Sequence, residues 1–257
     1  MTDPISQLQQ ASILIQDAIK QLQSAPVPTP VPAPTGVAPV GIPGAWKLAF
    51  SDDFDGTTLD SGKWESAWYN GAASTQNVRT SSANVAVSDG AAVLTLASAL
   101  SGAAITTRPR NNSGGFQFQT GVVEARIYFP GDGTSVYNWS GFWLLHDQLG
   151  SAASEIDVAE ILAGHATVNY HGQGSVNLGA VPGYWGGGWH TFACDRKVDS
   201  FDVYYDGKLV KTHPLADGNL PMYILLSVGR PNAGEGTPVY GPGGAMKVDY
   251  VRAWQPS

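Results

Sequence analysis

From Trp46 onward, the chain is a series of short apolar runs separated by turn signals. Alternation with a period of two within these runs is typical of strands that bury one face. Charged residues make up only 14% of the chain and 31 residues are glycine, which fits a turn-rich β domain. Tight turns are indicated by Asp-Gly pairs at 89–90, 206–207 and 217–218. The pattern therefore predicts an all-β sandwich over residues 45–257.

The first 44 residues have a different character from the rest. Within residues 1–24, apolar residues recur at alternating spacings of three and four, which is typical of a coiled-coil helix. Such a short helix needs a partner, so we expect it to self-associate or to dock on another protein, the alternative being a frayed amphipathic tail. Residues 25–44 alternate proline with small apolar residues, which predicts a semi-rigid, extended linker.

The segment 155–160 places three carboxylates, Glu155, Asp157 and Glu160, in a run that otherwise reads as a strand. Glu155 and Asp157 share a face, whereas Glu160 would face the other way unless Val158 or Ala159 forms a β-bulge. With a bulge, the two glutamates could bring their carboxyl groups to about 5 Å, the separation found in retaining glycosidases. The plainer alternative is an acidic, solvated strand face.

This motif, Glu-x-Asp-x-x-Glu, resembles glycoside hydrolase family 16, and particularly its laminarinase-like and endo-β-glucanase-like members. Further segments resemble that family in the same order along the chain: residues 46–64, 84–90, 113–126, 139–145, 189–192, 205–208 and 248–252. The sequence departs from the family pattern at Ser140-Gly141, where Pro-Ala is usual, at Arg196, where tryptophan is common, and at Ser227, where asparagine is common.

The resemblance implies a concanavalin-like β-jelly-roll sandwich that works as a retaining endo-glycosidase. Its substrate would be a β-linked polysaccharide: a β-1,3- or mixed-linkage glucan, or a bacterial exopolysaccharide. Glu155 would be the nucleophile and Glu160 the general acid/base, with Asp157 hydrogen-bonded to the nucleophile. Catalysis would need no cofactor. Many members hold a structural calcium ion, for which Asp249 matches a ligand position.

Five residues are candidates for contacts with the sugar: Trp139, Trp143, Asn169, His171 and Trp185. By the resemblance, Trp143 lines the subsite next to the cleaved bond and Trp139 flanks it. Asn169 and His171 alternate on the strand that follows the motif, and Trp185 lies in a glycine-rich loop. The alternatives are core packing for the tryptophans and, for a His171 without acidic partners, a merely polar rim position.

Other classes of function fit less well. A net charge of −7 argues against nucleic acid and anionic membranes as partners, and no apolar run is long enough to span a bilayer. The single cysteine, Cys194, is expected to be a buried core thiol. Residues at the N-terminus lack the pattern of a signal peptide. Together with the helix and linker, this suggests display on a bacteriophage virion. The alternatives are export by a non-classical route and a trimmed chain.

Two non-enzymatic functions stay open at this point. The same sandwich could be a non-catalytic, lectin-like adhesin that binds carbohydrate, or a structural virion decoration protein. Loss of a catalytic glutamate would favour the first of these, but both Glu155 and Glu160 are present. The second leaves the three carboxylates without a role.

Overall fold

The computed structural model describes residues 38–66, 74–75, 78–108, 114–146, 154–172 and 175–257. The helix predicted over residues 1–24 and the linker up to residue 37 lie outside the described residues, so both stay predictions. In the part that is described, no helix has the length and apolar character needed to cross a membrane.

Two sheets contain the described strands, and neighbouring strands run antiparallel except for β4 and β7. The eight-stranded sheet has the order β15-β14-β13-β8-β17-β6-β5, and β1 also pairs with β17. Its strands are β1 (Trp46–Asp52), β5 (Val85–Ser88), β6 (Ala91–Leu94), β8 (Gly121–Tyr128), β13 (Trp189–Arg196), β14 (Ser200–Tyr205), β15 (Lys208–Pro214) and β17 (Met246–Pro256).

The nine-stranded sheet has the order β12-β11-β10-β9-β16-β7-β4-β3, and β2 also pairs with β7. Its strands are β2 (Glu65–Ser66), β3 (Ser74–Thr75), β4 (Val78–Thr80), β7 (Ser101–Thr106), β9 (Trp139–His146), β10 (Glu155–Leu162), β11 (His165–His171), β12 (Val176–Ala180) and β16 (Met222–Gly229). Two short 3-10 helices, η1 (Ser82–Asn84) and η2 (Pro242–Gly244), complete the described elements.

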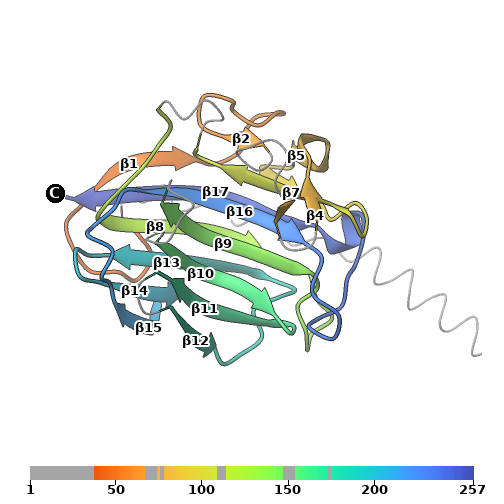
Figure 1. The fold of residues 1–257 in the computed structure, drawn as a ribbon. Coiled ribbons are helices and arrows are strands. Elements are labelled where there is room, and N and C mark those ends of the chain that lie inside the picture. The colour runs from red at the N-terminus through yellow and green to blue at the C-terminus, as the bar shows by residue number, and fades with distance from the viewer. Residues whose placement is uncertain (1–37, 67–73, 76–77, 109–113, 147–153, 173–174) are drawn as a thin grey trace, which may run out of the picture. The chain divides into compact units, whose positions relative to one another are not determined.

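The hydrophobic core lies between the two sheets, which form the two layers seen in Figure 1. Alternation along β9 shows how each strand divides its side chains: Phe142 and Leu144 enter this core, whereas Trp143 and Leu145 belong to a separate cluster on the other face. Cys194 is buried in the core, as predicted. This arrangement confirms the all-β jelly-roll sandwich.

A buried ion pair lies close to the start of the acidic strand. The Arg196 guanidinium, at the end of β13, is fully buried and lies 2.7 Å from Asp217 Oδ2. The same carboxylate oxygen accepts a hydrogen bond of 2.7 Å from Ser154 Oγ. Because Ser154 directly precedes β10, this pair fixes the start of the strand that carries the three carboxylates.

The described residues just before β1 pack on part of the outer face of the eight-stranded sheet. Ile42 is buried there in a small cluster with Val122, Ala193 and Trp254. The backbone N–H of Val40 donates a hydrogen bond of 2.9 Å to Glu124 Oε2, which accounts for a buried carboxylate on β8. Residues 40–42 are therefore part of the folded domain.

Candidate active site

A one-residue bulge interrupts β10 at the position expected from the sequence. Asp157 pairs with Asn169 and Glu160 with Thr167, so three steps on β10 face two steps on β11. Val158 and Ala159 both point into the core, where each is fully buried. The register then returns Glu160 to the face that carries Glu155 and Asp157, which confirms the predicted β-bulge.

The bulge is held from the opposite sheet. Val158 has no register partner on either neighbouring strand. Its carbonyl instead accepts a hydrogen bond of 2.9 Å from the hydroxyl of Tyr205, which crosses the core from β14. A buried carbonyl without a partner is costly, so Tyr205 stabilises the backbone conformation that aims Glu160. Tyr205 is not recognisable from the sequence, where its place before an Asp-Gly turn indicates only a strand end.

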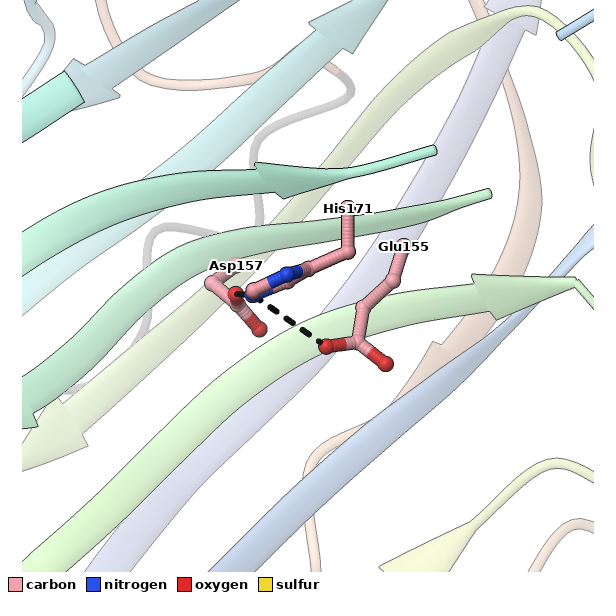
Figure 2. Close-up of side chains that lie close together, drawn as sticks. All are labelled: Glu155, Asp157 and His171. Atoms are coloured by element: carbon pink, nitrogen blue, oxygen red, sulfur yellow. Dashed lines mark ion pairs between the residues drawn. The ribbon is translucent and has the colours of Figure 1, made fainter. Parts of the chain in front are cut away.

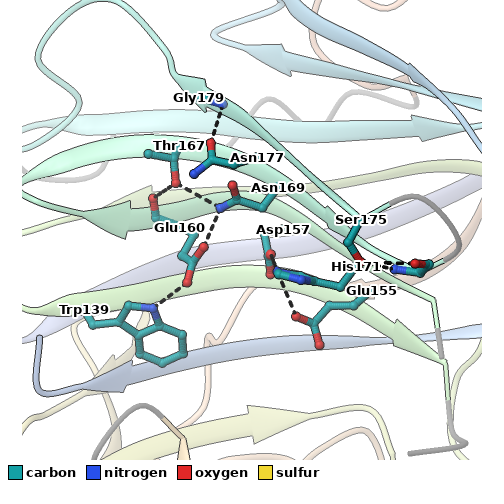
Figure 3. A network of polar contacts seen from close by, with 11 residues as sticks. Trp139, Glu155, Asp157, Glu160, Thr167, Asn169, His171, Ser175, Asn177 and Gly179 are labelled. Carbon is teal, nitrogen blue, oxygen red and sulfur yellow. Dashed lines mark hydrogen bonds and ion pairs between the residues drawn. The ribbon is translucent and has the colours of Figure 1, made fainter. Parts of the chain in front are cut away.

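Glu160 lies among hydrogen-bond donors from both neighbouring strands (Figure 3). Trp139 Nε1 on β9 donates to Oε1 at 2.7 Å, and Asn169 Nδ2 on β11 donates to Oε2 at 2.5 Å. Burial raises the pKa of Glu160, the Asp157 carboxylate raises it further, and these two hydrogen bonds oppose both effects. Thr167, which sequence analysis missed, donates to the Glu160 backbone carbonyl at 2.9 Å.

Glu155, Asp157 and His171 form a second group on the same face (Figure 2). His171 Nε2 lies 3.2 Å from Asp157 Oδ2 and 3.7 Å from Glu155 Oε1. Contact with Asp157 raises the pKa of His171 to about 9, in spite of the opposing effect of burial. His171 therefore has the acidic partners that would distinguish it from a merely polar rim residue.

The buried Asp157 and the partly buried Glu155 hold protons more tightly than free side chains do. Burial raises the pKa of Glu155 to about 8, and the charge of Asp157 adds to that effect, whereas the imidazolium of His171 opposes it. Burial also raises the pKa of Asp157, again opposed by His171. The site thus combines three carboxyl groups with one cation, and its electrostatics depend on His171.

Both predicted tryptophans of β9 lie beside the carboxylates. Trp139 donates to Glu160, and Trp143 is the register partner of Asp157. Trp143 is 6% exposed and its Nε1 donates to Ser227 Oγ at 3.0 Å on the adjacent strand β16. Ser227 was noted in the sequence only as a departure from the family pattern, and the structure gives it a role as the acceptor that orients the Trp143 ring.

Trp185 does not lie with these residues. Its ring packs edge to face on two core aromatics, with centroid distances of 4.9 Å to Tyr205 and 6.3 Å to Phe192. Its Nε1 is turned to the backbone carbonyls of Val181 and Pro182. The glycine-rich loop packs this partly buried tryptophan against the core, which favours the core-packing alternative over a sugar platform.

Asp249 lies on β17, in the eight-stranded sheet, and pairs with Arg126 at 2.7 Å. Within the described part of the chain, the grouping of three metal-ligating side chains is Glu155, Asp157 and His171, and Asp249 does not belong to it. Calcium can also be bound through backbone carbonyls, so the calcium site at Asp249 stays a prediction.

Residues 72–252 match the family model described as Glycosyl hydrolases family 16. The chain belongs to this family. It is 28% identical over 267 residues to glucan endo-1,3-beta-glucosidase A1 of Niallia circulans, a match that covers 81% of this chain and 38% of that protein. The family 16 chain thus spans well under half the length of this relative.

Solved structures of the same fold include several enzymes described as glucanases. The laminarinase catalytic domain of Thermotoga petrophila RKU-1 matches with a TM-score of 0.65 and 21% identity, over 83% of this chain and 99% of that one. The endo-β-1,3-glucanase of Pyrococcus furiosus matches with a TM-score of 0.67 and 20% identity, over 85% and 98%. At these identities the likeness establishes the fold of the family 16 domain.

Proposed function

We propose that this family 16 chain is a retaining endo-β-glucanase with Glu155 as nucleophile and Glu160 as general acid/base. The observation that carries the proposal is the bulge in β10, which aligns Glu155, Asp157 and Glu160 on one face. A simple strand would send Glu160 into the core. An acidic face that served only solubility would need no bulge. It would also not need the buried hydrogen bond that the Tyr205 hydroxyl donates to the Val158 carbonyl.

Burial and the adjacent Asp157 raise the pKa of both glutamates, and His171 opposes the shift at each. The raised pKa of Glu160 favours the protonated form that a general acid needs. Glu155 must ionise to act as the nucleophile, and the imidazolium of His171 is the group that favours its ionised form. The assignment of the two roles follows the family resemblance. In the proposed reaction, Glu155 attacks the anomeric carbon while Glu160 gives its proton to the leaving oxygen. Glu160 then takes a proton from water, which releases the sugar from Glu155.

The proposed substrate is a β-1,3- or mixed-linkage glucan. Apolar sugar faces stack on aromatic rings, and Trp139 and Trp143 lie on the same face as the carboxylates, next to Glu160 and Asp157. The two residues are 8% and 6% exposed, so each offers a sugar a small part of its ring. The names of the curated relative and of the two glucanases of known structure support a glucan. Family likeness alone would also fit other β-linked polymers, because one matching structure is described as a porphyranase.

Release of reducing sugar tests this proposal. The wild type and Glu155→Gln would be compared on laminarin, mixed-linkage glucan, agarose and bacterial exopolysaccharides. Asp89→Asn serves as a control because this exposed carboxylate lies in the turn between β5 and β6, at the edge of the other sheet. We expect wild type and control to hydrolyse a glucan and Glu155→Gln to be inactive. Equal activity of all three proteins would refute the assignment of Glu155. Failure of the wild type on every polymer, with binding retained, would favour a lectin-like protein.

Stereochemistry tests the retaining mechanism separately. NMR of the first products formed should show the β-anomer before mutarotation sets in, as expected for two successive displacements at the same carbon. Direct appearance of the α-anomer would require a water molecule between the carboxyl groups and would contradict a nucleophilic Glu155.

We also propose, from the sequence of residues 1–44, that the domain is displayed on a particle such as a bacteriophage virion. The heptad pattern within residues 1–24 and the proline-rich residues 25–44 support a self-associating helix and a spacer. Light scattering on the full chain tests the first part. A mass of two or more chains is expected, and a strictly monomeric chain at micromolar concentration would contradict self-association.

A further inference from the structure

Three side chains of the site converge as the ligands of a metal ion would. Glu155 and Asp157 come from β10, and His171 comes from the neighbouring strand β11, where it is the register partner of Glu155. One oxygen from each carboxylate and one imidazole nitrogen all lie within 4.8 Å of one another. Figure 2 shows the three side chains directed toward a common point.

The two distances from His171 Nε2 to the carboxylate oxygens are close to those around a small transition-metal ion. A tetrahedral zinc ion with bonds of about 2.0–2.1 Å separates its ligand atoms by about 3.3 Å. The contacts of His171 Nε2 with Asp157 Oδ2, at 3.2 Å, and with Glu155 Oε1, at 3.7 Å, lie close to that value. The donor set contains an imidazole nitrogen, whereas calcium and magnesium prefer oxygen ligands alone. One nitrogen and two oxygens therefore favour zinc and similar cations.

A second observation also points to a cation. Asp157 is 5% exposed, yet its Oδ2 receives no hydrogen bond that meets the usual geometry. The positive charge beside this oxygen is the His171 imidazolium, with Nε2 at 3.2 Å. A metal ion bound between the two atoms would displace the proton of Nε2 and take its place as the cation beside the buried carboxylate. The His171 side chain is 57% exposed, so an ion can reach this oxygen from solvent without movement of the sheet.

We propose that Glu155, Asp157 and His171 form a binding site for one divalent transition-metal ion of the zinc type. Three protein ligands leave at least one position of the ion for water. The bound ion would occupy Glu155 Oε1 and would therefore inhibit the enzyme reversibly. Metal binding does not depend on the proposed function, whereas the inhibition rests on Glu155 being the nucleophile.

Calorimetric titration of the full chain with Zn²⁺ tests binding directly, and the absorption spectrum of bound Co²⁺ reports the geometry. The wild type is expected to bind one ion per chain with a tetrahedral Co²⁺ spectrum. His171→Asn should weaken binding at least about tenfold, a change of about 1.4 kcal/mol. His165→Asn is the matched control, because this exposed histidine begins the same strand. Its binding should equal that of the wild type.

Glu155→Gln provides an independent second variant, and thermal melting without metal establishes that each variant is folded. Weakened binding in both His171→Asn and Glu155→Gln supports the site. A wild type that binds no Zn²⁺ at micromolar concentration, or variants that bind as tightly as the wild type, would overturn it.

Enzyme assays separate this proposal from the proposed function. If the wild type hydrolyses a glucan, Zn²⁺ should abolish the activity and a chelator should restore it, at a metal concentration that matches the calorimetric affinity. If the wild type hydrolyses no polymer, the glucanase proposal fails, while the titration still decides whether the metal site exists. Full activity with the site saturated would mean that the ion does not block Glu155.

Discussion

The charge of His171 and the charge of Asp157 should move the pH profile of this enzyme in opposite directions. The imidazolium lowers the pKa of Glu155, and the Asp157 carboxylate raises it. His171→Gln removes the cation, so Glu155 should need a higher pH to ionise, and the acidic limb of kcat/KM should shift upward. Asp157→Asn removes the anion, and the same limb should shift downward.

The distance between the charges sets the size of the effect. His171 Nε2 lies 3.7 Å from Glu155 Oε1, where two unit charges interact by about 1 kcal/mol in bulk water and about 4.5 kcal/mol at an effective dielectric constant of about 20. At about 1.4 kcal/mol for each pKa unit, these limits correspond to about one to three pH units. The His171 side chain is 57% exposed, so we expect a shift near one unit for His171→Gln.

The assay is kcat/KM on a soluble β-glucan from pH 4 to pH 10, where the acidic limb reports the ionisation of the free enzyme. His165→Gln, at the start of the same strand, should leave the profile unchanged. An acidic limb that moves the same way in His171→Gln and Asp157→Asn, or in neither, would refute this electrostatic account of Glu155.

Three further substitutions test the framework of the site. Arg196→Met should lower the free energy of unfolding by about 3–5 kcal/mol in urea, because it leaves a buried carboxylate unpaired. Tyr205→Phe should cost about 1–3 kcal/mol and should lower kcat more than it raises KM, since the bulge loses its hydrogen bond. Trp139→Phe removes a hydrogen bond that lowers the pKa of Glu160, so the alkaline limb of the pH profile should move to higher pH. Unchanged stability of Arg196→Met would contradict the first account, and unchanged kinetics of Tyr205→Phe the second. An unchanged alkaline limb in Trp139→Phe would contradict the third.

The bulge could be predicted because the spacing of the acidic and apolar residues within one strand indicates it. A period-two pattern that breaks between Asp157 and Glu160, with apolar residues at the break, has one simple solution in a strand that buries one face. The tryptophans of β9 followed from the family resemblance, and the structure places them beside the carboxylates. For these features, sequence-local information was sufficient.

Contacts across strands were less accessible to sequence reasoning. His171 meets Glu155 only because β10 and β11 pair with Glu155 opposite His171, a register that no local pattern specifies. Tyr205 reaches Val158 from the other sheet, and the two lie 47 residues apart in the chain. For Trp185 the sequence left both a sugar platform and core packing open, and the contact with Tyr205 that favours packing comes from a distant strand.

The segment at residues 40–42 determines how the domain can be attached to a surface. It is packed on the outer face of the eight-stranded sheet through Ile42 and through the bond from Val40 to Glu124. The three carboxylates lie on the outer face of the other sheet, across the full thickness of the sandwich. A bead or sensor chip coupled next to Val40 would therefore leave Glu155 and Glu160 facing the solution. Coupling in an orientation set by the fold should preserve access for a long polymer chain.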